Sequence, residues 1–282
     1  MPKYVLKALR RFQIKPPSKP VHSPAKFEPP VHGSKVQYSK QGLSGDALPA
    51  QSILFIQQVA GVFLYYGRAL DNKMLVTIND ISHEQSSATT STMAIVNHFL
   101  DYAATHPIAK LRYHKSNMIL HVHSDGSYLS VSKSYSRAGG HFFLSNNSIQ
   151  PHNAPKNGPI NVLCTILKNV MSSAAETEIA AAFENAKEAI PIRNTLKFLN
   201  HPQPPTPVQV DNTTAVSFAN KELKQKRSKA IDMRFYWLQD RVEQKQFHVY
   251  WHPGSENYAD YYTKHFSTKN HVSKRPFYLH VD

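Results

Sequence analysis

Four acidic residues lie at positions where their carboxylates could share a metal ion. Asp125 ends the apolar run "NMILHVHS", which is typical of a buried strand, and Asp211 ends the shorter run "VQV". Glu178 and Asp260 lie in segments of helical composition. A buried carboxylate is rare unless it is paired or bound to a cation. Because strand ends of an α/β sheet meet where its topology switches, we expect the four side chains to converge.

An all-carboxylate cluster favours hard cations, because Mg²⁺ and Mn²⁺ prefer oxygen ligands. Two such ions about 4 Å apart can activate a water molecule and stabilise the leaving oxygen in phosphodiester cleavage. Each acid also has a simpler explanation: Asp211 could cap the helix that follows it, and Asp260 could stabilise the start of its own helix. Only the set of four predicts a two-metal site.

The charge of the chain points to a polyanionic partner. Lys and Arg number 33 against 19 Asp and Glu, for a net charge of +14. This excess favours nucleic acid before a membrane surface, although it could also be a solubilising surface. The run "KELKQKRSK" is expected either to contact phosphates or to form a solvated helix end. Its basic residues are Lys221, Lys224, Lys226, Arg227 and Lys229.

The sequence predicts an intracellular protein, cytoplasmic or nuclear, without a membrane anchor. The start, "MPKYVLKALRRF", lacks the basic-then-apolar pattern of a secretory signal. The longest apolar stretch, "SILFIQQVAGVFLYYGRAL", is interrupted by two Gln and an Arg, whereas a membrane span needs about 20 mostly apolar residues. The single cysteine, Cys164, allows neither an internal disulfide nor a Cys-rich zinc site.

Residues 1–110 are expected to be mainly helical, with a proline-rich linker at residues 14–50. Residues 1–13 could form one basic helix, and "KPPSKPVHSPAKFEPP" contains six prolines, which favour extended backbone. From Ser52, apolar residues recur on one helical face, and a second helix is expected at residues 92–105.

Residues 111–268 are expected to form an α/β domain, followed by a C-terminal tail at 269–282. Three strand-like runs precede a helix rich in Ala and Glu, and the full order reads β-β-β-α-β-α-α-β-α. Hairpin connections followed by helical crossovers predict a mixed five-stranded sheet with helices on both faces.

Five blocks of this second domain resemble, in order, the ribonuclease H region of copia-type LTR retrotransposon polyproteins. The blocks are "HSDGSYLS", "MSSAAETEIAAA", "PVQVDNTTAVSFANKE", "RSKAIDMRFYWLQDRV" and "FHVYWHPGSENYADYYTK". The family patterns are S-D-[AG]-[SDW], S-S-x-E-A-E-Y, C/V-D-N, K-H-I-D-x-R and A-D-x-x-T-K. One block alone would be a weak signal, but five in order over residues 117–265 are specific.

The resemblance implies a ribonuclease H fold that binds two Mg²⁺ or Mn²⁺ ions and cleaves the RNA strand of an RNA–DNA hybrid. Matched by position, the acids of its Asp-Glu-Asp-Asp site are Asp125, Glu178, Asp211 and Asp260. Asn212, from the V-D-N block, joins the expected nucleic-acid contacts. The chain departs from the family at Ala230, where the family usually has His.

His252 lies eight residues before Asp260 in the last block. Cellular ribonucleases H often place a mobile His in this loop to help the product leave. The resemblance therefore implies the same role for His252, unless its side chain only holds the end of the strand.

The resemblance extends to the first 110 residues. "YVLKALRRF", "VAGVFLYYGRALD" and "VNHFLDYAATHP" are similar to the thumb and connection region that follows a polymerase palm. The palm motif Y-x-D-D is absent from all 282 residues, so we expect no DNA polymerisation. The expected partners are an RNA–DNA hybrid and the remainder of a reverse transcriptase.

Three alternatives remain open. A zinc hydrolase could use His121, His123 and Asp125, which share one face of a strand, although further His ligands are not evident and three of the acids stay unexplained. A remnant could bind nucleic acid without cutting it. An integrase or resolvase shares the sheet topology, but the helix at "SSAAETE" and the block "ADYYTK" favour ribonuclease H.

Two neighbouring glutamates should have different roles. Ser173 is the expected N-cap of the Ala-rich helix, and Glu176, three residues later, should reach back to the Ser173 amide in a capping box. Glu178 points to another face and is predicted to bind metal. The small residues Ala181 and Ala182 should let this helix lie close to the sheet.

Overall fold

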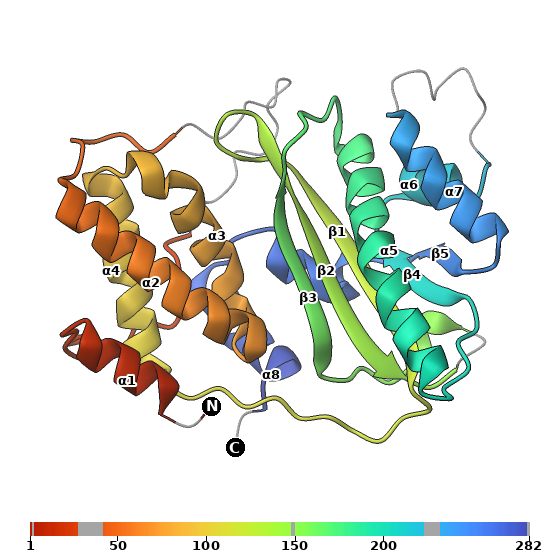
Figure 1. Ribbon diagram of the computed structural model, residues 1–282, viewed down its shortest axis with the longest axis horizontal. Helices are drawn as coiled ribbons and strands as arrows, with labels where there is room; N and C mark the ends of the chain where they lie inside the picture. Colours follow the sequence, from red (N-terminus) through yellow and green to blue (C-terminus); the bar gives the residue numbers. More distant parts are fainter. Residues whose placement is uncertain (2, 28–41, 148–149, 223–231, 281–282) are drawn as a thin grey trace. The chain divides into compact units, whose positions relative to one another are not determined.

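The chain folds into two compact units. The computed structural model describes all residues except 2, 28–41, 148–149, 223–231 and 281–282 (Figure 1). The first unit comprises Met1–Arg112 and Lys264–Asp282, and the second unit is the continuous segment Tyr113–Thr263. The expected boundary at residue 110 therefore lies at residue 112, and the expected C-terminal tail belongs to the first unit.

The first unit is helical, as predicted. Its α-helices are α1 (Tyr4–Arg11), α2 (Ala50–Ala69), α3 (Leu75–Glu84), α4 (Thr90–Thr105) and α8 (Thr268–Tyr278). Helices α2 and α4 bury aromatic side chains against each other, including Phe63 and Phe99, whose rings meet edge to face at 5.1 Å. In the part of the chain that the structure describes, no helix is long and apolar enough to span a membrane.

Helix α8 is held in the first unit by polar contacts that local sequence patterns do not reveal. Arg275 Nη1 donates to the hydroxyl oxygen of Tyr102 at 3.0 Å. Nearby, His265 Nε2 lies 2.8 Å from a carboxylate oxygen of Asp80. These contacts help to tie residues 264–280 to the helices of the first unit.

The second unit contains the predicted mixed five-stranded sheet, in the order β3-β2-β1-β4-β5. Strands β1, β2 and β3 are antiparallel, whereas β4 runs parallel to both β1 and β5. The strands are β1 (Ile119–Val131), β2 (Tyr135–Ser145), β3 (Pro159–Leu167), β4 (Thr206–Val210) and β5 (Phe247–Trp251). The α-helices of this unit are α5 (Ala174–Phe198), α6 (Thr213–Ala219) and α7 (Tyr236–Glu243).

Helical segments cover both faces of this sheet. Adjacent residues of a strand point to opposite faces. On one face Asn185 of α5 donates to the Ser124 hydroxyl at 2.9 Å, and α5, α6 and α7 share one apolar core there. On the other face, next to Asp125, lies the 3₁₀ helix η7 (Tyr258–Tyr262). The prediction that helices cover both faces of the sheet is therefore confirmed, but on the second face the helix is a short 3₁₀ helix, η7.

The α-helix expected over "SENYADYYTKHF" is wrong, because this segment forms two short 3₁₀ helices, η6 (Gly254–Glu256) and η7. Tertiary hydrogen bonds hold it in that form. The side-chain Nδ2 of Asn257 donates to the carbonyl oxygen of Ser124 at 2.7 Å, and its Oδ1 accepts from the Ala259 backbone amide at 3.0 Å. A helix was also expected over residues 227–244. The structure has a shorter one there, α7, which begins at Tyr236 after the 3₁₀ turn Met233–Phe235. Residues 227–231 lie outside the described residues.

Candidate metal centre

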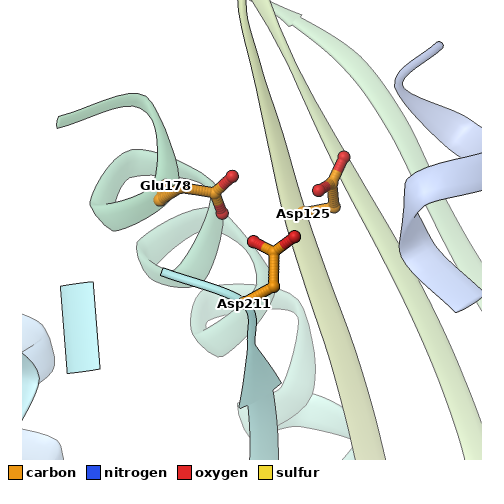
Figure 2. Close-up of side chains that lie close together, drawn as sticks. All are labelled: Asp125, Glu178 and Asp211. Carbon is orange, nitrogen blue, oxygen red and sulfur yellow. The ribbon is translucent and has the colours of Figure 1, made fainter. Parts of the chain in front are cut away.

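Three of the four predicted acids form one cluster. Asp125, Glu178 and Asp211 each offer a carboxylate oxygen, and these oxygens all lie within 4.8 Å of one another. Asp125 and Glu178 are buried, and Asp211 is half-buried. Figure 2 shows that the three side chains come from a strand, a helix and the segment after a second strand. The convergence expected from the sequence is therefore present for these three.

Asp125 lies within β1, where the next residue lets the sheet approach α5. A Cβ atom on Gly126 would lie 2.8 Å from the Thr177 carbonyl oxygen and 3.0 Å from the Glu178 amide nitrogen. Only a residue without a side chain allows this backbone contact. The Asp-Gly pair therefore places one acid and also sets its distance from the next.

Glu178 is presented by the first turns of α5, and the predicted helix register is present. Ser173 is the N-cap, and its hydroxyl accepts a hydrogen bond from the Glu176 amide at 3.1 Å. The carboxylate of Glu176 reaches back to Ser172 and not to Ser173, accepting from the Ser172 amide at 2.7 Å. Glu176 thus has the structural role expected of it, with its partner shifted by one residue. Ala181 and Ala182 are buried, as expected for a helix close to the sheet.

Asp211 follows the last residue of β4 and precedes Asn212, the residue before α6. Asn212, and not Asp211, is the N-cap of α6, and its side-chain oxygen accepts from the Thr214 amide at 2.9 Å. The side chain of Asp211 is therefore not needed as a cap. Its carboxylate faces Gly254, because a Cβ atom there would lie 2.4 Å from Asp211 Oδ2. The Asp211 carbonyl also accepts from Trp251 Nε1 at 3.0 Å.

Asp260 lies on η7 and is outside the 4.8 Å set found among the described residues. Its carbonyl oxygen is 3.1 Å from the Thr263 hydroxyl. The structure thus brings three of the predicted ligands together and leaves the fourth on the neighbouring segment.

His252 follows β5 directly, and its side chain contacts two other polar side chains, those of Glu256 and His152. Its Nε2 is 3.0 Å from a carboxylate oxygen of Glu256, and its ring stacks on His152 with centroids 4.6 Å apart. The hydrogen bond from His252 lowers the pKa of Glu256. His252 is only 15% exposed, so the Glu256 contact could hold this loop at the end of the strand.

The zinc-hydrolase hypothesis is not supported, because His121 and His123 belong to no cluster of potential metal ligands found among the described residues. His123 Nδ1 accepts from the Tyr258 amide at 3.1 Å, and its Nε2 lies 3.2 Å from Lys156 Nζ. His121 Nε2 lies 3.1 Å from the Asn146 carbonyl oxygen. Burial lowers the pKa of His121 to about 4 and that of His123 well below its usual range. These histidines are neutral core residues with protein partners.

Two residues of the expected nucleic-acid surface can be placed. Asn212 caps α6, and Lys221 forms an exposed ion pair with Glu243 at 2.7 Å. The other expected contacts, Lys224, Lys226, Arg227 and Lys229, lie outside the described residues.

A hard cation fits the chemistry of the cluster. Three carboxylates this close repel one another when ionised, and burial of two of them adds a desolvation cost. The described donor set offers oxygen atoms alone, which suits Mg²⁺ or Mn²⁺ better than Zn²⁺.

The second unit thus combines the mixed five-stranded sheet that the sequence predicted with a cluster of three of the four expected acids. No family model matches the chain. Over 107 residues it is 31% identical to the retrovirus-related Pol polyprotein from transposon TNT 1-94 of Nicotiana tabacum. This match covers 38% of the chain and 8% of that polyprotein. The resemblance to a retrotransposon polyprotein is thereby confirmed, and the chain spans only a small part of that relative's length.

Solved ribonuclease H domains are among the structural neighbours. One is the N-terminal RNase H domain of rv2228c from Mycobacterium tuberculosis, solved as a fusion with maltose-binding protein, with 12% identity and a TM-score of 0.36. That match covers 51% of this chain and 95% of the other. The PFV RNase H domain has 16% identity and a TM-score of 0.34, with 53% and 93% covered.

Proposed function

We propose that the second unit is a metal-dependent endoribonuclease that cleaves the RNA strand of an RNA–DNA hybrid. The cluster of Asp125, Glu178 and Asp211 is the observation that carries this proposal. Two bound Mg²⁺ or Mn²⁺ ions would activate a water molecule and stabilise the leaving oxygen. The 2′-hydroxyl group distinguishes the RNA strand from the DNA strand.

The residues of the chain have separate tasks in this mechanism. Asp125, Glu178 and Asp211 hold the metal ions, and Asp260 completes the ligand set from the neighbouring η7. The positions of Asp125 on β1, Glu178 on α5 and Asp211 after β4 support metal binding by these three residues, because a site on regular elements keeps its geometry. His252 assists departure of the product from the loop after β5.

The net charge of the chain indicates which kind of partner it binds. A net charge of +14 on a chain whose candidate site is acidic favours a polyanion bound through basic residues elsewhere in the chain. In this proposal the run containing Lys221, Lys224, Lys226, Arg227 and Lys229 contacts phosphates, together with Asn212. The first unit is then a thumb and connection remnant, and the remainder of a reverse transcriptase is a second partner.

The test is hydrolysis of a hybrid whose RNA strand is labelled, by the purified full chain with Mg²⁺, with Mn²⁺ and with EDTA. We expect cleavage with either ion and none with EDTA. Asp125→Asn should abolish cleavage while the circular dichroism spectrum stays unchanged. Hybrid binding without cleavage under all conditions would instead identify a non-catalytic binding protein, and full activity of Asp125→Asn would refute the site assignment.

A further inference from the structure

A threonine next to the acid cluster contacts one of its carboxylates. The Thr263 hydroxyl donates a hydrogen bond to Asp125 Oδ2, although the two residues are 138 positions apart in the chain. Both side chains are buried, with 0% of Thr263 and 1% of Asp125 exposed. Water therefore competes little for either group. Thr263 is also the threonine of the block "ADYYTK", to which the four-acid site assigns no role.

The surrounding structure fixes this contact from both ends of η7. Before η7, the side-chain Nδ2 of Asn257 donates to the carbonyl oxygen of Ser124, the residue preceding Asp125. After η7, Thr263 binds the Asp125 side chain itself. The backbone of β2 also comes close, since a Cβ atom on Gly139 would lie 2.7 Å from both the Ala259 carbonyl oxygen and Thr263 Cγ2. The segment from 257 to 263 therefore binds β1 at two neighbouring groups, the carbonyl oxygen of Ser124 and the side chain of Asp125.

We propose that Thr263 is a positioning residue that orients the Asp125 carboxylate for metal binding. This inference rests on the metal site of the proposed function. An ionised carboxylate has about four lone-pair sites, so one hydrogen bond to Oδ2 leaves capacity for a metal ion. A hydrogen bond to an ionised group is shorter and stronger than a neutral one, so it can select one side-chain rotamer. Partners that orient metal ligands in this way strongly affect metal affinity.

The experiment compares Mn²⁺ affinity of the full chain and its variants by isothermal titration calorimetry, without nucleic acid. Thr263→Val replaces the hydroxyl by a methyl group of similar size, and Thr263→Ser keeps the hydroxyl. Thr206→Val is the matched control, because Thr206 is also fully buried in the second unit and its hydroxyl accepts from Arg193, an interaction that involves none of the three clustered acids. Asp125→Asn marks the affinity of a chain without the site.

We expect Thr263→Val to weaken Mn²⁺ binding by roughly tenfold to a hundredfold. Thr263→Ser should restore most of the affinity, and Thr206→Val should bind Mn²⁺ as the unchanged chain does. Unfolding midpoints measured in EDTA for all variants separate loss of fold from loss of metal affinity. Raising the Mn²⁺ concentration should also restore hybrid cleavage by Thr263→Val.

Two results would overturn the proposal. One is an unchanged Mn²⁺ affinity in Thr263→Val, and the other is an equal loss of affinity in Thr206→Val. Failure of the ribonuclease assignment looks different: the unchanged chain would bind Mn²⁺ and lose affinity on Thr263→Val, yet leave the hybrid intact.

Discussion

The Gly126 backbone lies so close to Thr177 that a Cβ atom on Gly126 would come within 2.8 Å of the Thr177 carbonyl oxygen. One of these residues follows Asp125 and the other precedes Glu178. The contact therefore sets the separation of two proposed metal ligands through the backbone.

Gly126→Ala should damage both the fold and the site. The added methyl group meets main-chain atoms, which cannot rotate away, so β1 and α5 must separate. We expect a loss of about 1–3 kcal/mol in the free energy of unfolding, measured with urea, and a large loss of hybrid cleavage. Gly61→Ala in α2 is the control, because a Cβ atom there meets nothing within 4 Å. It should stabilise the chain by up to about 1 kcal/mol. A fully active and stable Gly126→Ala would contradict the close approach.

Gly254→Ala should act on Asp211 alone. Its Cβ atom would lie 2.4 Å from Asp211 Oδ2, the end of a side chain that can turn away. We therefore expect weaker Mn²⁺ binding and slower cleavage, with little change of the unfolding midpoint in EDTA. Titration calorimetry and thermal unfolding measure the two effects. Normal metal affinity in this variant would mean that Asp211 does not bind the ion from this position.

Glu178→Gln should abolish hybrid cleavage, whereas Glu176→Gln should leave it largely intact. Glu178→Gln removes a ligand charge from the cluster and should abolish cleavage with little loss of stability. Glu176→Gln keeps an oxygen that can accept from the Ser172 amide, so it should remain active and lose less than about 1 kcal/mol. Hybrid cleavage and urea unfolding of both variants test this. If Glu176→Gln were the inactive one, the assignment of the two roles would be reversed.

Acid should destabilise the second unit through its buried histidines. Burial lowers the pKa of His141 to about 3 and that of His121 to about 4, from 6.5 in the unfolded chain. Between these values and pH 6.5 the unfolded chain binds more protons, so the free energy of unfolding falls as the pH falls. From pH 6.5 to pH 4 we expect a loss on the order of 3 kcal/mol per histidine.

Urea unfolding between pH 4 and pH 8 measures this dependence. His141→Gln should flatten the slope below pH 6.5, while the same change at the exposed His114 should leave it as it is. An unchanged slope in His141→Gln would show that His141 takes up its proton in the folded chain.

His252→Ala separates product release from chemistry. If His252 helps the product leave, steady-state turnover should fall while the single-turnover rate of cleavage stays the same. If it transfers a proton in the cleavage step, the single-turnover rate should itself fall by roughly a hundredfold or more. Quenched-flow measurements with excess enzyme and with excess hybrid distinguish the two, and unchanged rates in both would leave His252 only its contacts with Glu256 and His152.

The sequence was sufficient to predict the parts of the site that depend on local pattern. The end of β4 before Asp211, and the cap at Ser173 that sets the register of Glu178, follow from apolar runs and capping rules. The strand end expected at Asp125 is wrong, because pairing with β2 continues past this residue and β1 ends only at Val131. The sequence did not predict that the segment carrying Asp260 is 3₁₀ helical, because contacts with Ser124 and Asp125 on a distant strand override its local preference. The contact of Thr263 with Asp125 was not predicted for the same reason, since the two residues lie far apart in the chain.

The division of the chain into a continuous and a discontinuous unit determines the order in which the protein can fold during synthesis. The second unit is complete once Thr263 has been made, whereas Tyr102 and Asp80 of the first unit must wait for Arg275 and His265. Since domains fold as units during synthesis, the second unit can form before the unit that begins ahead of it in the sequence. Until residues 268–278 have left the ribosome, the other helices of the first unit lack α8.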